Sequence, residues 1–298
     1  MNLVELTPGG PRLSPVVVGA WRLSEWGWSP QERLRWIEQC IELGATSFDH
    51  ADIYGGYLGE GLFGEALALK PSLRQQIQLV SKLGIKLVSP QRPGHTIKHY
   101  DTSAAHIRWT VDNALQQLRT DHLDLLLIHR PDPLLDADEV ARAFEQLIAA
   151  GKLRGVGVSN FTPAQFELLN SRIALQTNQV ELHPLNRQVL DDGTLDQCQR
   201  LRVRPMIWSP LAGGALFTSD EPAAQRVRQV LTALAERHAC SAATIAHAWL
   251  LRLPSRPLPI VGSRRPEALR EAVAALDLRL DAPEWTEIWS AATGQRVP

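Results

Sequence analysis

Short apolar segments alternate with amphipathic segments along most of the chain. Runs rich in apolar and β-branched residues predict buried strands, and eight of them begin near Val16, Thr46, Ile77, Leu123, Leu153, Leu175, Arg204 and Leu258. Most intervals between these starts are long enough for a helix and two loops. The hydrophobic pattern therefore predicts eight consecutive strand–helix units.

The intervening segments carry helix signals. The stretch Ser29 to Glu32 is a capping box with proline at the first helical position, and apolar residues from Leu34 to Ile41 follow at helical spacing. A second box opens at Thr162. The interval before the last strand holds two helical patterns, and Asp281 to Glu284 caps a final helix. Each crossover is therefore expected to be helical.

These units predict an α/β fold: a single (β/α)8 TIM barrel with an extra helix before the last strand and a C-terminal helix. One domain is expected over residues 1–298. A doubly wound open sheet of eight strands has the same periodicity and remains an alternative. The barrel is favoured because polar side chains suited to chemistry stand at the ends of several different strands.

Composition and charge narrow the classes of function. The chain has 31 Lys and Arg against 32 Asp and Glu, so no net charge attracts nucleic acid or an anionic membrane. Its cysteines, Cys40, Cys198 and Cys240, have neither metal-ligand nor disulfide-framework spacing. No signal peptide or long apolar stretch stands out. We expect a cytoplasmic protein with no nucleic-acid partner, no membrane association and no bound metal.

Four polar residues stand at or just beyond the ends of three consecutive predicted strands. Asp49 ends the second strand and Tyr54 follows it, Lys82 ends the third, and His129 ends the fourth. Each has an ordinary structural role available, such as a helix cap, a rim aromatic, a lysine reaching solvent or a core histidine. Parallel neighbouring strands would bring all four to one mouth of the barrel, which favours an active site.

The four residue types suit the reduction of a carbonyl group. A lysine ammonium beside a phenol favours the phenolate, so Lys82 is expected to lower the pKa of Tyr54 below its reference value of about 10. Asp49 would keep the lysine charged. A neutral His129 would orient the carbonyl oxygen, so that the tyrosine can donate a proton to an aldehyde or ketone.

One motif points elsewhere. The stretch Gly59 to Gly64 satisfies G-x-G-x-x-G, which suggests a dinucleotide-binding turn. The preceding strand ends ten residues earlier at Asp49, and no acidic residue from Ala66 to Tyr100 can bind a ribose hydroxyl. We interpret these glycines as loop and helix-start residues.

The segments that carry the four residues resemble the catalytic segments of the aldo-keto reductase family. The similarity extends through six ordered stretches: Asp49 to Gly55, Val80 to Lys82, Leu127 to Pro131, Gly155 to Phe161, Asn178 to Glu181 and Trp208 to Leu211. Within the family, His50 to Gly56 and His129 to Pro133 are similar to the YdhF-like bacterial oxidoreductases. The resemblance covers nearly the whole chain.

This resemblance implies NADPH-dependent reduction of aldehydes and ketones. Tyr54 would be the general acid, tuned by Lys82 and Asp49, and His129 would orient the carbonyl. The cofactor, NADPH or NADP⁺, would lie against residues at or beyond the ends of five of the predicted strands: Gly19, Trp21, Arg22, Ser159, Asn160, Gln179, Trp208, Ser209, Pro210, Leu211, Gly213, Gly262, Ser263, Arg264 and Glu271. Trp208 would stack on the nicotinamide ring, and Ser159, Asn160 and Gln179 would bind its carboxamide.

The adenosine end departs from the family pattern. Many members have lysine where Gly262 stands and asparagine where Ala272 stands. Arg264, after the last strand and before a helix, offers a guanidinium for a ribose 2′-phosphate, which favours NADPH over NADH. A solvated arginine pair is the alternative reading of Arg264 and Arg265.

The substrate is expected to be a small carbonyl compound. Trp21 and Tyr57 would line its pocket together with the segment Leu83 to Asp101, but the sequence does not identify the substrate. Monomers are frequent in the family. Two other classes stay open: an NADPH-binding regulatory subunit of the channel β-subunit type, for which no basic arm is seen, and a metal-dependent barrel hydrolase, whose first-strand His-x-His is missing.

Overall fold

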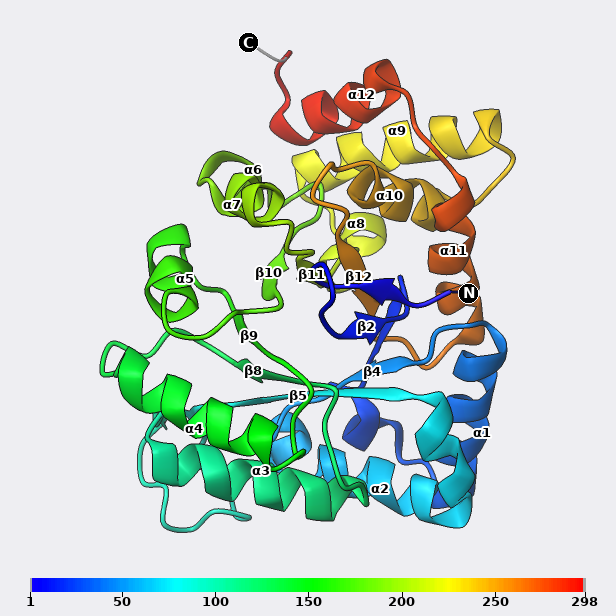
Figure 1. Ribbon diagram of the computed structural model, residues 1–298. Helices are drawn as coiled ribbons and strands as arrows, with labels where there is room; N and C mark the ends of the chain where they lie inside the picture. The colour runs from blue at the N-terminus through cyan, green and yellow to red at the C-terminus, as the bar shows by residue number, and fades with distance from the viewer. Residues whose placement is uncertain (1, 297–298) are drawn as a thin grey trace.

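The structure, a computed structural model, describes residues 2–296 and contains a closed barrel of eight parallel strands (Figure 1). In order around the ring these are β3 (Val17–Gly19), β4 (Ser47–Asp49), β5 (Gln78–Leu83), β8 (Leu125–Ile128), β9 (Val156–Ser159), β10 (Asn178–Glu181), β11 (Met206–Trp208) and β12 (Leu258–Val261). Pairing of β12 with β3 closes the ring. The predicted barrel and its eight strands are confirmed, and the open sheet is wrong. The expected domain, residues 1–298, includes Met1, Val297 and Pro298, which lie outside the described residues.

Helices surround the barrel and cover the outer faces of its strands (Figure 1). They are α1 (Pro30–Glu42), α2 (Gly59–Leu69), α3 (Ala104–Leu118), α4 (Ala137–Ala149), α5 (Pro163–Asn170), α6 (Gln188–Asp191), α7 (Thr194–Leu201), α8 (Ala215–Thr218), α9 (Pro222–Arg237), α10 (Ala242–Leu251), α11 (Pro266–Ala274) and α12 (Ala282–Thr293). The extra helix expected before the last strand is present, since both α9 and α10 precede β12. The C-terminal helix α12 packs along α9.

Local sequence fixes where three of these helices begin. The capping boxes predicted at Ser29, Thr162 and Asp281 all form, with the side chain of each accepting from the backbone N–H three residues on. Proline occupies the first or second helical position in all three. Such caps satisfy backbone donors that have no partner inside the helix, so these helix starts could be predicted from the sequence.

Side chains fill the interior of the barrel below the rim. Val17, Val80, Leu125 and Met206 belong to one buried cluster, with one or two residues from each of several strands. A hairpin of β1 (Val4–Glu5) and β2 (Arg12–Leu13) adds the fully buried Leu6 and Leu13 to this cluster. Side chains therefore fill the barrel at the amino-terminal ends of the strands. The other end, at the carboxyl ends of the strands, is where an active site is expected. This hairpin was not predicted, because strands of two residues carry no readable periodicity.

The G-x-G-x-x-G stretch lies in α2, where Gly59 is the first helical residue. A Cβ built on Gly64 would lie 1.9 Å from the backbone carbonyl oxygen of Gln117 at the end of α3. Gly64 therefore lets two helices approach closely. This packing gives the motif a structural reason that does not involve a nucleotide.

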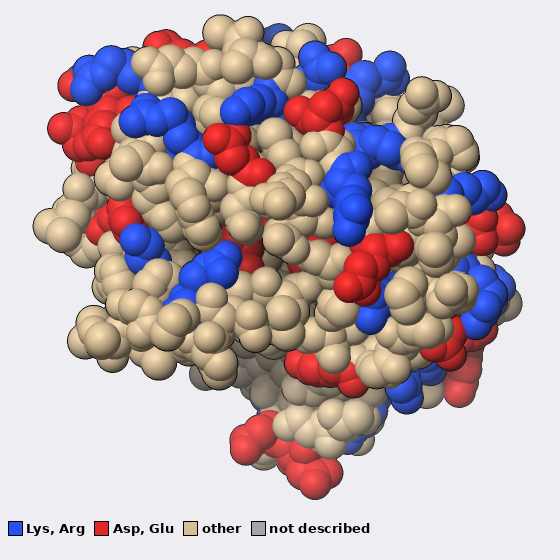
Figure 2. All heavy atoms as spheres, turned by 90° about the horizontal axis from the view of Figure 1, so that it is seen from below, with Lys and Arg blue, Asp and Glu red and all other residues tan. Residues whose placement is uncertain are grey.

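The surface shows no concentration of one charge on the face seen in Figure 2, where basic and acidic side chains are interspersed. This distribution agrees with the near balance of charge in the sequence, a formal net charge of −1. Among residues 2–296, no helix is both long and apolar enough to cross a membrane.

Candidate active site

Strand order and register bring the four predicted catalytic residues to one rim of the barrel. β4, β5 and β8 are direct neighbours, with Asp49 opposite Val80 and Leu83 opposite Ile128. His129 directly follows β8, and its backbone N–H donates to the carbonyl of Leu83 at 2.8 Å. Because all three strands are parallel, their carboxyl ends meet at the same edge.

Lys82 is the centre of this group. It is fully buried, and its ammonium donates to Asp49 Oδ2 at 2.7 Å, to the backbone carbonyl of His50 at 2.8 Å and to Tyr54 Oη at 2.9 Å. An ammonium has three N–H donors, so all are satisfied. Burial alone would lower the pKa of Lys82, but the Asp49 carboxylate and Tyr54 hold it above its ordinary value. Lys82 is therefore charged at neutral pH.

Asp49 is held from two sides. Its Oδ2 accepts from Lys82, and its Oδ1 accepts from Nε2 of Gln179 at 2.8 Å. Only 3% of Asp49 is exposed, which makes the ion pair a buried one. The carboxylate is therefore fixed in place as the counter-charge of the lysine.

The Tyr54 hydroxyl accepts from Lys82, which leaves its own proton free to be donated toward the cavity. Burial raises the pKa of Tyr54 above its ordinary value of 10.0, while the nearby Lys82 acts in the opposite direction. The expected net lowering is therefore wrong for the free protein, because desolvation of the phenolate outweighs the ammonium. Tyr54 stays protonated at neutral pH, the state that a proton donor needs.

His129 lies beside Tyr54, with ring centroids 5.8 Å apart. Burial, and then the positive charges of Lys82, Arg130 and Lys98, place the pKa of His129 well below its ordinary value. The ring is therefore neutral near pH 7. A neutral imidazole can donate one hydrogen bond to a carbonyl oxygen without competing with Tyr54 as the acid.

These residues open into a cavity of about 920 Å³ at the rim, in the upper part of the range of roughly 300–1,000 Å³ found for small-molecule sites. Most of the predicted site residues line it: Gly19, Trp21, Arg22, Asp49, Tyr54, His129, Ser159, Gln179, Trp208, Ser209, Pro210, Leu211, Gly213, Gly262, Ser263 and Glu271. Lys82 lies behind Tyr54 and does not border the cavity. Asn160, Arg264 and Tyr57 are also absent from its walls, and each has a different explanation.

Asn160 supports its neighbours instead of facing the cavity. Its Nδ2 donates to Ser159 Oγ at 2.7 Å, and its Oδ1 accepts from the indole N–H of Trp208 at 3.1 Å. The residue has a positive φ of 59°. Asn160 therefore orients Ser159 and Trp208, which do line the cavity.

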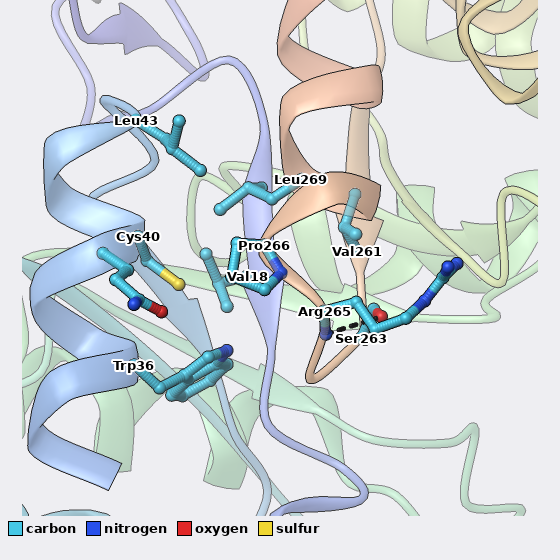
Figure 3. A pocket seen from close by; sticks show the side chains of 10 residues that line it. Val18, Trp36, Cys40, Leu43, Val261, Ser263, Arg265, Pro266 and Leu269 are labelled. Carbon is cyan, nitrogen blue, oxygen red and sulfur yellow. Dashed lines mark hydrogen bonds between the residues drawn. The ribbon is translucent and has the colours of Figure 1, made fainter. Parts of the chain in front are cut away.

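At the adenosine end, Arg265 borders the cavity and Arg264 does not. The backbone N–H of Arg265 donates to Ser263 Oγ at 3.1 Å, which shapes the turn before α11. Figure 3 shows the Arg265 side chain pointing away from Trp36 and Cys40 of α1. The sequence does not show which of the two arginines borders the cavity, because the direction of each side chain depends on this turn.

Tyr57 anchors a loop and is not a wall of the pocket. Its Oη accepts from the backbone N–H of Leu87 at 2.7 Å, and the guanidinium of Arg92 lies 4.7 Å from its ring centroid. The same guanidinium lies 5.1 Å from the ring of Trp109 on α3. These contacts hold the β5–α3 loop (residues 84–103), which contains β6 (Ile85–Lys86) and β7 (His99–Tyr100), against the barrel rim.

The segment Leu83 to Asp101 was expected in the substrate pocket, and four of its residues line the cavity. These four were not named individually from the sequence, and two cavity residues beside the loop were not expected. The six residues are Ile53, Ile85, Leu87, Lys98, Tyr100 and Arg130. Arg130 carried a signal, because it directly follows His129 at the end of a barrel strand. The sequence did not indicate which residues of the loop face the cavity, since only the tertiary contacts of Tyr57 and Arg92 determine which side of the loop faces inward.

The comparisons with known proteins agree with this geometry. The model of the aldo/keto reductase family matches residues 15–293. The chain belongs to this family. Similar proteins include oxidoreductase YdhF of Escherichia coli (strain K12), 51% identical over 99% of each chain, and the uncharacterized oxidoreductase YcsN of Bacillus subtilis (strain 168), 48% identical over 96% of this chain and 97% of the other. A 6-dehydroglucose reductase of Agrobacterium fabrum is 41% identical over 96% of each chain.

Solved structures share the aldo-keto reductase barrel. The thermostable aldo-keto reductase Tm1743 in complex with the inhibitor epalrestat has a TM-score of 0.81 and 27% identity, over 98% of this chain and 100% of that one. The protein is thus an aldo-keto reductase family oxidoreductase, and the resemblance stated from its motifs is confirmed. The channel-subunit alternative is not favoured, because the relatives above are named oxidoreductases and reductases.

Proposed function

We propose that this aldo-keto reductase converts aldehydes and ketones to alcohols with NADPH. The observation that carries the proposal is the buried Lys82 ammonium, which donates to Tyr54 Oη at 2.9 Å and to Asp49 at 2.7 Å, two residues that line a large cavity. A relative named 6-dehydroglucose reductase, 41% identical, supports a carbonyl substrate.

In this mechanism Tyr54 donates its proton to the carbonyl oxygen as that oxygen gains charge. Lys82 then stabilises the phenolate that remains, because its ammonium already contacts Oη. Asp49 compensates the buried positive charge before and after the transfer. His129, neutral in the free protein, donates a hydrogen bond to the same oxygen and fixes its direction.

The other half of the cavity fits a nicotinamide dinucleotide. When bound, NADPH supplies the hydride. Trp208 offers a large flat face for the ring. The Oε1 atom of Gln179 remains available for the carboxamide, since its Nε2 already donates to Asp49. Glu271 and Ser263 lie on the side of the cavity that would hold the adenosine.

Arg265 is the residue proposed to select NADPH over NADH. Arg265 borders the cavity beside the start of α11, where a helix N-terminus and a guanidinium together favour a phosphate. A charged hydrogen bond contributes about 1.5–3 kcal/mol. Arg265→Ala is therefore expected to raise the Kd for NADPH by roughly tenfold or more and to change that for NADH little.

Arg264→Ala is the matched control, since it removes the same group one residue away and outside the cavity. Titration of each variant with NADPH and NADH, followed by tryptophan fluorescence, measures both constants. Equal losses for the two cofactors in Arg265→Ala, or a larger NADPH loss in Arg264→Ala, would show that Arg265 does not bind the 2′-phosphate.

The activity itself is tested by incubating the purified protein with NADPH and a panel of aromatic and aliphatic aldehydes. The alcohol formed should equal the NADPH consumed. Tight NADPH binding with no consumption for any carbonyl would contradict reductase activity and would revive a role in which the protein only binds the cofactor.

A further inference from the structure

We propose that the preferred substrates of the proposed reductase are carbonyl compounds bearing an acidic group, such as a carboxylate, held by Arg130 and Lys98. The inference rests on the proposed function and specifies its substrate class. It concerns the part of the cavity next to Tyr54 and His129. No motif in the sequence assigned these two cations a role.

Arg130 is positioned at the reacting end of the cavity. It directly follows His129, and its guanidinium carbon lies 5.6 Å from the ring centroid of Trp208. The side-chain hydrogen bond that it makes is to the backbone carbonyl of His129 at 3.3 Å. Among residues 2–296, no carboxylate lies within 4.0 Å of it. Most of its donors are therefore available to a ligand.

Lys98 supplies a second cation from the β5–α3 loop. It lines the same cavity as Arg130, and its charge helps to lower the pKa of His129, after the larger effects of burial, Lys82 and Arg130. Within the described part of the chain, Lys98 forms no ion pair. Two cations without a counter-charge therefore face the place where the carbonyl must bind.

The acidic residues nearby do not neutralise these cations. Asp49 and Glu271 are the only carboxylates among the described residues that line the cavity. Asp49 is paired with Lys82, and Glu271 lies on α11 at the adenosine end. Glu181 contributes an attractive charge to Arg130, but its own oxygens accept from Asn186 and contact His183.

The cofactor would not neutralise them either. Lys98 and Arg130 follow β5 and β8, which are adjacent strands. Arg22 and Arg265, the cations expected near the dinucleotide, follow β3 and β12, which are adjacent to each other and separated from β8 in the ring. Arg265, the cation proposed for the cofactor phosphate, therefore lies on a different part of the ring from Lys98 and Arg130.

Apolar residues complete the substrate side. Trp21, Ile53, Ile85 and Leu87 line the same cavity as the two cations. A fitting substrate has a compact apolar body, a carbonyl that reaches Tyr54 and His129, and an anionic group that pairs with the guanidinium and the ammonium. A guanidinium binds a carboxylate through two parallel hydrogen bonds, which would also orient the carbonyl.

A pair of substrates of equal shape tests this proposal. We would compare 4-carboxybenzaldehyde with the neutral 4-carbamoylbenzaldehyde, and use glyceraldehyde as a neutral polyhydroxylated aldehyde. The acid is expected to have a KM at least about tenfold lower than the amide, which corresponds to roughly 1.4 kcal/mol. Added salt should raise the KM of the acid more than that of the amide.

Lys98→Gln and Arg130→Gln should each raise the KM of the acid about tenfold more than that of the amide. Arg108→Gln, which removes an exposed cation on α3, is the control and should leave the acid-to-amide ratio unchanged. An amide or glyceraldehyde KM equal to or below that of the acid overturns the proposal. An unchanged acid-to-amide ratio in Lys98→Gln also overturns it, since Lys98 is exposed and its substitution leaves the core packing intact. If the wild-type protein consumed no NADPH with any of these aldehydes, the proposed reductase function itself would be contradicted.

Discussion

Tyr54→Phe is expected to reduce kcat for aldehyde reduction by about 10²–10⁴-fold, the usual contribution of a positioned general acid. The substitution removes only the hydroxyl that accepts from Lys82 at 2.9 Å, and the ring stays beside His129. The binding of NADPH should change little, because the proposed cofactor contacts lie on other strands. Single-turnover reduction and an NADPH titration measure the two effects separately.

Tyr57→Phe is the matched control, since Tyr57 does not line the cavity and the substitution removes a phenol hydroxyl that accepts from the backbone N–H of Leu87. It should retain most of the turnover. If Tyr54→Phe retained kcat, or if both variants lost activity equally, Tyr54 would not be the acid. A large loss of NADPH affinity in Tyr54→Phe would mean that the residue acts mainly through the cofactor.

Lys82→Met is expected to destabilise the protein as well as inactivate it. The fully buried ammonium neutralises Asp49, which is itself only 3% exposed, and removal of one partner of a buried pair costs about 3–5 kcal/mol. The remaining carboxylate would be buried with only Gln179 as a hydrogen-bond donor. Chemical denaturation monitored by circular dichroism measures the free energy of unfolding.

The double variant Asp49→Asn with Lys82→Met separates charge from packing. It removes both charges, and the asparagine carboxamide still offers an oxygen to Gln179. Much of the lost stability should return, while activity should not. A Lys82→Met protein as stable as the wild type would show that the buried ion pair contributes little to the free energy of unfolding. A double variant less stable than both single variants would show that the lost stability comes from packing and not from the unpaired charge.

The sequence was informative where backbone geometry determines side-chain position. Strands of a closed parallel barrel must end at one rim, so Asp49, Lys82 and His129 could be placed together from the ends of three apolar runs. Helix starts such as Ser29 were equally readable, because a cap is a local hydrogen bond.

Prediction was weaker where a loop decides the direction of a side chain. Arg264 and Arg265 are equivalent in the sequence, and only the turn before α11 determines that Arg265 borders the cavity. Tyr57 was expected in the pocket, but its hydroxyl accepts from Leu87 and holds the β5–α3 loop. The expected lowering of the Tyr54 pKa was wrong for a different reason. Residue types do not reveal how strongly burial opposes the effect of a nearby charge on a pKa.

The central claim is that a reduced nicotinamide in this cavity delivers hydride to a carbonyl that Tyr54 protonates. The most direct measurement uses NADPH carrying deuterium at the transferred position of its nicotinamide C4, with 4-carboxybenzaldehyde and the wild-type protein, and analyses the alcohol by mass spectrometry and NMR. We expect one deuterium per alcohol, bound to the former carbonyl carbon, and almost no labelled alcohol with Tyr54→Phe. Alcohol formed without deuterium, or none formed by correctly folded protein saturated with NADPH, would contradict it.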